Sequence, residues 1–299
     1  MTIRPLALLD LFVAIVMVSI WLRISGGELL DVWHNHGLFT RMLLANCILI
    51  PALGFLLVRV FPLNPEARIG ILLLAAIPGT PIALQFTRQA KTRLAFTAAV
   101  TFVLSAVSLA MTPLAVQVMP EIARRSERPL LLLFTDIVKC IALPLAAGVL
   151  AARFWPKVAS RLALPLGLLA SAMFVFLMWE TRLLRREAFN ATRGGGAIAA
   201  MLLLLLLAML IGWCIGGPER ESRRVLATTT GMRNVIVVLY VARYCFPDTH
   251  VFMVPMAYLA LMVPTNLIFH LVFVGWQKLW PAQESVGQMS YVRTKSNPT

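Results

Sequence analysis

Apolar segments of about twenty residues recur along the whole chain, separated by short polar or basic stretches. A helix needs ~20 consecutive apolar residues to cross the hydrocarbon core of a bilayer, so each segment is a potential membrane span. Nine spans are predicted. They cover residues 5–24, 37–61, 66–87, 94–118, 130–152, 159–180, 194–215, 221–246 and 249–277.

Composition agrees with a membrane protein and leaves no room for a soluble domain. Apolar residues make up 60% of the chain and charged residues 13%, whereas soluble proteins average about 25% charged residues. The net charge of +14 lies mostly in short loops, where anionic lipid headgroups and topology explain it better than nucleic acid does. The sequence predicts an all-α, multi-pass membrane protein whose partners are lipid and a small-molecule solute, and it leaves the oligomeric state open.

The loop charges favour one orientation by a small margin. With the carboxyl-terminal tail in the cytoplasm, fourteen lysines and arginines lie on the cytoplasmic side and eleven on the other. This positive-inside bias, with an odd number of spans, predicts an amino terminus outside the cell. The absence of long extramembrane domains favours a compact transporter of a bacterial inner membrane.

Two of the nine predicted spans contain helix-breaking sequences at their centres. The span 66–87 contains PGTP, which an unbroken helix cannot accommodate, so the backbone must unwind there. The span 221–246 contains TTTG, a weaker break, and Arg233 follows two residues later. The residues of the two breaks are Pro78, Gly79, Thr80, Thr228, Thr229, Thr230 and Gly231.

Paired interruptions of this kind are typical of secondary transporters. Unwound backbone at the middle of the membrane supplies helix ends and free carbonyls to a substrate or an ion, and the two breaks occupy corresponding positions in the two halves of the chain. In the alternative interpretation, proline and glycine only kink two ordinary helices.

The segments AAIPGTPIALQFTRQAKTRLAFTAAVTF and TTTGMRNVIVVLYVARYCF resemble the two crossover motifs of the bile acid:sodium symporter family. The resemblance implies a ten-helix inverted repeat in which two broken helices cross, here without the first helix. It also implies one transporter unit over 1–299. Its core domain would cover approximately 37–118 and 194–277, its panel domain 5–24 and 130–180, and its cytoplasmic tail 278–299.

Carrying the family's sodium ligands onto this chain shows that several are replaced. In the second motif the glutamate position falls on Thr229 and the glutamine position on Arg233. In the first motif the serine and asparagine positions fall on Ala83 and Leu84. No carboxylate remains, and Thr97, Thr101 and Thr229 are the possible residual sodium ligands. The other polar residues expected at the site are Asn46, which matches a family glutamine, Asn234 and Asn266.

The presence of Arg233 suggests why this chain could lose the family's sodium ligands. Two unit charges 4 Å apart repel by about 4 kcal/mol at an effective dielectric near 20, so sodium is disfavoured beside a guanidinium. We expect Arg233 to act as a built-in cation that faces a polar cavity, with the carbonyls of the broken backbone as partners, and to attract an anionic substrate. Lipid exposure would cost ~2.5–3.5 kcal/mol. In the alternative interpretation Arg233 is purely structural.

The predicted function is secondary transport of small organic anions or related amphipathic solutes by alternating access. It needs no cofactor, and the role of sodium is left open. The alternatives are a sodium-coupled symporter that uses the remaining hydroxyl and carbonyl ligands, and a receptor or scaffold that does not transport. The sequence contains neither paired intramembrane aspartates nor an HExxH motif, which would indicate a membrane enzyme or a zinc site.

Overall fold

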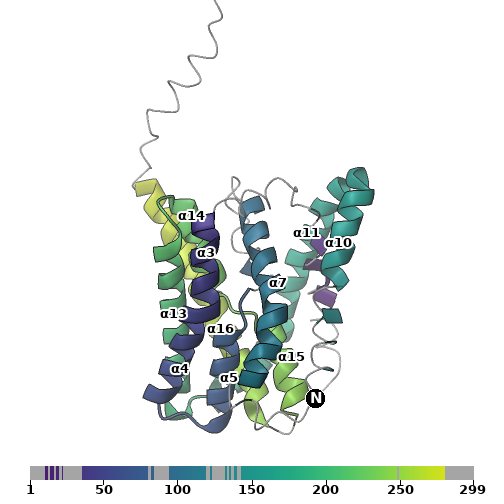
Figure 1. The fold of residues 1–299 in the computed structure, drawn as a ribbon. Coiled ribbons are helices and arrows are strands. Elements are labelled where there is room, and N and C mark those ends of the chain that lie inside the picture. Colours follow the sequence, from purple (N-terminus) through teal and green to yellow (C-terminus); the bar gives the residue numbers. More distant parts are fainter. Residues whose placement is uncertain are drawn as a thin grey trace, which may run out of the picture. The chain divides into compact units, whose positions relative to one another are not determined.

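The computed structural model describes four continuous stretches, residues 36–79, 94–118, 143–247 and 249–279, and fifteen isolated positions between residues 11 and 139. Within these residues the chain is helical and contains no strand (Figure 1). Six helical segments of the described chain are long and apolar enough to cross a membrane, and they coincide with six of the nine predicted spans. They are His36–Val60, Ala99–Gln117, Pro156–Glu180, Gly194–Ile215, Arg220–Cys245 and His250–Gly275.

The remaining three predicted spans are not established as crossings. Residues 5–24 are described at only eight positions, and residues 130–152 are described mainly through the short helix α10, Leu143–Phe154. The continuous helix described in the span 66–87 is α5, Pro65–Ala76, whose 12 residues reach about 18 Å at 1.5 Å per residue. A count of nine and an inverted repeat therefore remain predictions.

The helices that position the two breaks are α5, α7 (Leu94–Val118), α13 (Ala197–Ile215), α14 (Arg220–Gly231) and α15 (Val235–Cys245). The second predicted span, 37–61, consists of α3 (His36–Leu44), the π-helix η1 (Ala45–Leu49) and α4 (Ile50–Val60). The other elements are α11 (Pro156–Glu180), α12 (Arg182–Ala191), η3 (Gly194–Gly196), η4 (His250–Phe252) and α16 (Met253–Leu279).

The first break lies where the proline predicted it. The helix α5 starts on Asn64, whose side chain accepts from Ala67 N at 2.8 Å, and it ends at Ala76, before Ile77 turns extended (φ −102°, ψ 100°). Gly79 then adopts a φ of +72°, a left-handed conformation that favours glycine. The unwinding at residues 77–79 is confirmed; Thr80, predicted to belong to the break, lies outside the described residues.

The second break exists, but the predicted position was wrong. The TTTG sequence is still helical, because α14 continues to Gly231 and the chain becomes extended only at Met232 (φ −80°, ψ 98°). Gly231 has no positive φ. Threonine is tolerated here because its hydroxyl can bond a carbonyl of the preceding turn, and Thr229 Oγ1 donates to Val225 O at 2.9 Å.

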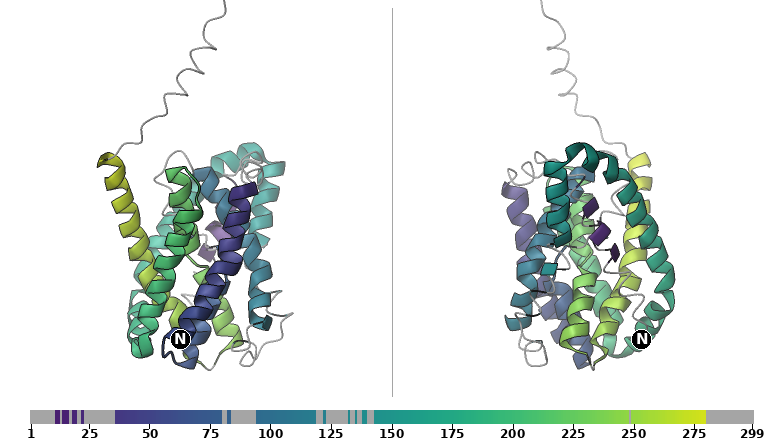
Figure 2. Two further views of the ribbon diagram at one scale, coloured as in Figure 1. Left: turned by 60° about the vertical axis from the view of Figure 1, so that its left-hand side comes forward. Right: turned by 90° about the vertical axis from the view of Figure 1, so that its right-hand side faces the viewer.

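The two breaks meet through the backbone. Asn234 N, at the start of α15, donates to Ile77 O, just beyond the end of α5, at 3.3 Å. Around this contact α13 packs along α14, α4 packs on α5, and α7 packs against α5 and α14 (Figure 1 and Figure 2). These contacts all lie within residues 1–263. Residues from Pro264 onwards, which include the second part of α16, form a separate unit.

Candidate functional site

Arg233 is the centre of the site, and its side chain is completely buried. Its guanidinium donates from Nε to Leu74 O at 2.9 Å and from Nη2 to Ala75 O at 2.7 Å. From Nη1 it donates to Asn46 Oδ1 at 2.8 Å and, more weakly, to Thr230 O at 3.4 Å. Four of the five N–H groups of the guanidinium are therefore used within the protein.

The acceptors explain why the arginine can be buried. The last four carbonyls of a helix have no partner within it, and the C-terminal end carries a partial negative charge of about half an electron. Leu74 and Ala75 lie in the last turn of α5, and Thr230 lies in the last turn of α14. The guanidinium therefore neutralises the C-terminal ends of two half-helices at once and joins the two breaks through a side chain.

Asn46 connects this cluster to the neighbouring span. Its Oδ1 accepts from Arg233, while its Nδ2 donates to Met42 O at 3.0 Å and to Thr230 Oγ1 at 3.3 Å. Asn46 lies in the π-helix η1, and single π turns inside α-helices often occur at functional sites. Sequence reasoning predicted Asn46 as a site residue but not the π-helix.

Tyr258 completes the end of α14, and sequence reasoning missed it. Its hydroxyl donates to Gly231 O at 2.8 Å, and the side chain is fully buried. Together with the contacts of Thr228 O to Met232 N and of Thr230 O to Arg233, this bond gives the end of α14 partners for three of its last four carbonyls. A single tyrosine in an apolar helix gave no signal that its hydroxyl would cap another helix.

A row of hydroxyls lies on the buried face of α7. Thr97, Thr101 and Ser105 follow at intervals of four residues, so they share one side of the helix. Among the described residues, Thr101 Oγ1 and Ser105 Oγ have no hydrogen-bond partner, and the same is true of Asn234 Nδ2 at the second break. None of the four hydrogen bonds of Arg233 goes to α7, so these hydroxyls are not bonded to the guanidinium.

The oxygens around Arg233 are already engaged within the protein. Within the described residues no carboxylate forms an ion pair with Arg233. The carbonyl oxygens of Leu74 and Ala75 already accept from the guanidinium. Thr229 Oγ1 is directed to its own helix. The expectation that Arg233 faces a polar cavity was wrong, because protein atoms enclose it completely.

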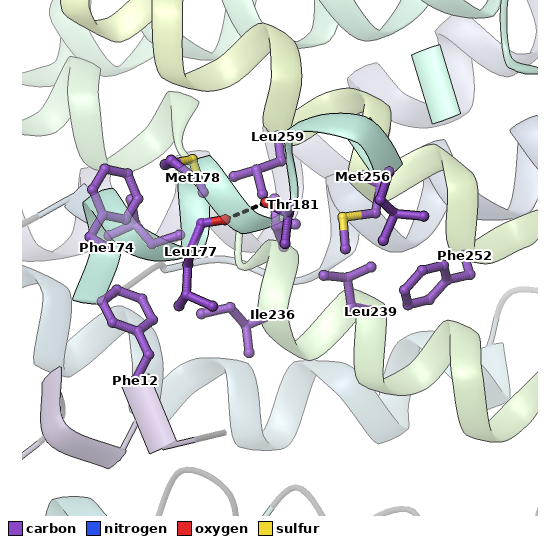
Figure 3. Close-up of a pocket in the computed structure, with 13 residues that line it drawn as sticks. Phe12, Phe174, Leu177, Met178, Thr181, Ile236, Leu239, Phe252, Met256 and Leu259 are labelled. Carbon is purple, nitrogen blue, oxygen red and sulfur yellow. Dashed lines mark hydrogen bonds between the residues drawn. The ribbon is translucent and has the colours of Figure 1, made fainter. Parts of the chain in front are cut away.

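A separate, apolar pocket lies between α11, α15 and the first part of α16 (Figure 3). Aromatic, aliphatic and methionine side chains form its wall, and Thr181 is its one hydroxyl. The lining residues are Phe12, Ile82, Phe174, Leu177, Met178, Thr181, Leu184, Val235, Ile236, Leu239, Phe252, Met256 and Leu259. Val235 and Ile236 open α15 directly after the second break, so the pocket lies two residues in sequence from Arg233.

The structure thus brings together some of the predicted site residues. Hydrogen bonds join Arg233, Asn46 and Thr230, and Asn234 and Gly231 lie next to them in the chain. Gly79 packs on α7, since a Cβ there would lie 2.6 Å from the backbone carbonyl carbon of Leu104, and Pro78 precedes it. Asn266 lies in the unit from Pro264 onwards, so its membership of the site stays a prediction.

Two interrupted helices that meet end to end among membrane-crossing helices define the architecture of a secondary transporter. The model of the sodium bile acid symporter family matches residues 10–186, more than half of the chain, and the chain belongs to that family. It is therefore a membrane transporter and not an enzyme. A comparison with curated proteins gives no match to this chain.

Proposed function

We propose that this protein transports amphipathic organic anions without coupling to sodium, and that Arg233 takes the place of the family's sodium ions. The observation that carries the proposal is the position of the guanidinium. It binds the C-terminal carbonyls of α5 and α14, and in transporters with broken helices such carbonyl ends coordinate the driving cation.

The charge balance supports this role. A resident cation stabilises the negative ends of the two half-helices permanently, so the crossover does not need a bound ion to reach its compact geometry. A sodium ion at the same carbonyls would lie close to the guanidinium and would be repelled by several kcal/mol. The guanidinium already supplies donors to carbonyls at the ends of both half-helices, so these carbonyls need no bound sodium.

The substrate class follows from the pocket. Apolar side chains of α11, α15 and α16 suit a rigid hydrophobic body, and the pocket lies beside the second break. Arg233 is enclosed by protein atoms, so it supplies a positive field behind α15 rather than a direct contact. Movement of the broken helices against α11 would then expose the pocket to one side of the membrane at a time.

One observation favours a second function, sodium symport at a different place. Thr101 Oγ1 and Ser105 Oγ are buried on α7 and have no partner among the described residues, and hydroxyl oxygens can coordinate hard cations. A symporter that uses these hydroxyls would keep its dependence on sodium in spite of Arg233. The third possibility, a receptor or scaffold, predicts no transport at all.

Uptake into proteoliposomes separates the three functions. Purified protein would be tested with a panel of labelled amphipathic anions, bile-acid conjugates included, in sodium buffer and in choline buffer. The proposal expects equal initial rates in the two buffers. Loss of uptake in choline would establish sodium symport, and failure with every anion of the panel in both buffers would favour the receptor.

A double substitution tests the role of Arg233 itself. Thr229→Glu with Arg233→Gln restores the two residues of the family motif and should make uptake rise with sodium concentration. Arg233→Gln alone should slow uptake, because the carbonyl ends lose their cation and gain no carboxylate to attract sodium. Unchanged, sodium-independent uptake in Arg233→Gln would contradict the proposal.

A further inference from the structure

The pocket has a positive group at its edge that the proposed function does not use. Arg185, on α12, donates from Nη1 to Thr181 Oγ1 at 2.7 Å and from Nη2 to Met178 O at 2.7 Å. Both Thr181 and Met178 line the pocket. Figure 3 shows the Thr181 hydroxyl bonded to Leu177 O inside the wall, so a chain of hydrogen bonds runs from the wall to the guanidinium.

Arg185 keeps donors for a further ligand. Nη1 uses its two N–H groups on Thr181 and on the sulfur of Met178, and Nη2 uses one on Met178 O. Nε and the second N–H of Nη2 have no hydrogen-bond partner among the described residues. No described carboxylate forms an ion pair with Arg185. Partial burial lowers the pKa of the Arg185 guanidinium, although the group stays charged at physiological pH.

A structural role accounts for only part of this arrangement. An arginine close to the C-terminal end of a helix commonly donates to its last carbonyls, and Met178 O belongs to the last turn of α11. That role does not require a position beside a pocket. Three fixed contacts also orient the guanidinium, so little side-chain freedom remains to be lost when an anion binds.

The other arginines of this region have different surroundings. Arg182 lies over the ring of Trp179 at 4.1 Å and donates to its carbonyl, and Arg193 lies over Phe189. Arg186 is exposed. Of the four arginines between residues 182 and 193, Arg185 is the one with hydrogen bonds to pocket-lining residues, which singles it out from a general basic surface.

We propose that Arg185 determines substrate specificity: it binds the carboxylate, sulfonate or sulfate of an amphipathic anion whose hydrophobic body occupies the apolar pocket. This inference rests on the proposed function for the identity of the pocket as a substrate site. The hydrophobic body supplies affinity through burial, and the guanidinium discriminates charged from neutral molecules through charge-assisted hydrogen bonds.

Equilibrium binding to the purified protein in detergent tests the inference independently of transport. The probes are an amphipathic carboxylate and its neutral amide, which share one hydrophobic body. Arg185→Gln should weaken binding of the carboxylate about tenfold or more and leave binding of the amide within about twofold. Arg185→Lys should retain part of the preference, and the matched control Arg186→Gln should behave as the wild type.

The ratio of the two affinities, for the carboxylate and for the amide, distinguishes a loss of specificity from a folding defect, because a misfolded variant would lose binding of both probes. An unchanged carboxylate-to-amide ratio in Arg185→Gln would overturn the inference. Sodium-dependent uptake would refute the proposed function while leaving this ratio intact, so the two failures are distinguishable. Competition by phosphatidylglycerol in mixed micelles as strong as that by the carboxylate would overturn the proposed ligand class; a lack of competition would support it.

Discussion

At the scale of single residues, Arg233 shows how a charge can be buried in a membrane protein with no carboxylate partner among the described residues. Its partners are carbonyl oxygens of Leu74, Ala75 and Thr230 and the amide oxygen of Asn46. Each carries only a partial charge, but two of them lie at the negative end of α5. The guanidinium donates hydrogen bonds to carbonyls that have no partner within their helix, and these carbonyls in turn stabilise the buried charge.

Removing this side chain should destabilise the fold. Arg233→Met leaves at least two buried carbonyls and Asn46 Oδ1 without a donor, and each unsatisfied group costs about 1–3 kcal/mol. We expect a loss of about 2–5 kcal/mol in total, because water and local relaxation recover part of the cost. A thermal unfolding series in detergent measures this as a clearly lower melting temperature. Arg233→Lys should lose less, because an ammonium retains the charge and three donors.

Arg186→Met serves as the control, since Arg186 is exposed on α12 and exposed substitutions usually change stability by less than 0.5 kcal/mol. A variant Arg233→Met that melts with the wild type would show that the cluster adds nothing to stability.

At the scale of elements, the breaks depend on how each half-helix ends. In the first, Pro78 removes a backbone donor and Gly79 takes a positive φ against α7. In the second, Met232 becomes extended and Asn234 caps α15 by accepting from Val237 N at 3.3 Å. The two breaks are built from different residues. They lie together because a backbone hydrogen bond and the side chain of Arg233 join them.

Gly79, at the first break, should not tolerate a side chain. In Gly79→Ala the methyl group would meet the Leu104 carbonyl carbon at 2.6 Å, and a left-handed conformation already costs about 1–2 kcal/mol for a residue with a Cβ. We expect a marked loss of thermal stability and of uptake, measured side by side on the same preparation.

Gly217→Ala isolates the conformational cost. Gly217 has a φ of +80° but open space around its Cβ position, so its substitution should lower stability modestly and leave uptake intact. Equal losses in the two variants would contradict a specific packing role for Gly79.

These elements also show how far the sequence could predict the site. Pro78 and Gly79 act through backbone geometry that is local to them, so the first break could be located from the sequence. The second break was predicted one to four residues too early. Thr228–Thr230 have a low helix propensity, but tertiary contacts keep them helical. Arg233 and Leu74 are 159 residues apart, and no local pattern specifies that pairing. The π-helix at Asn46 and the hydroxyl of Tyr258 were invisible for the same reason.

At the scale of the whole molecule, the spans constrain which loops share a side of the membrane. The helix α11 is a 25-residue candidate span, so its two ends must open on opposite faces if it crosses. The predicted orientation places the start of α11 in the cytoplasm and α12, with Arg185, outside. Under that orientation the edge of the pocket that Arg185 marks would face the outside of the cell.

Single-cysteine labelling tests this arrangement. In a background that lacks the native cysteines, Arg186→Cys should react with a membrane-impermeant maleimide in intact cells, whereas Lys157→Cys should react only in inverted vesicles. Both side chains are exposed, so a difference in labelling reports sidedness and not burial. The reverse pattern would invert the predicted orientation, and labelling of both positions from one side would exclude α11 as a span.

The resident guanidinium has a consequence for the direction of flow. A co-transported ion adds the free energy of its own gradient to transport. An arginine stays in the protein through the whole transport cycle, so it supplies no energy for accumulating the substrate. A monovalent anion that crosses alone is then governed by the voltage, which supplies about 2.3 kcal/mol per 100 mV, or about fiftyfold in concentration. In a cell with a negative interior, such a carrier would work as an exporter unless a second anion leaves in exchange.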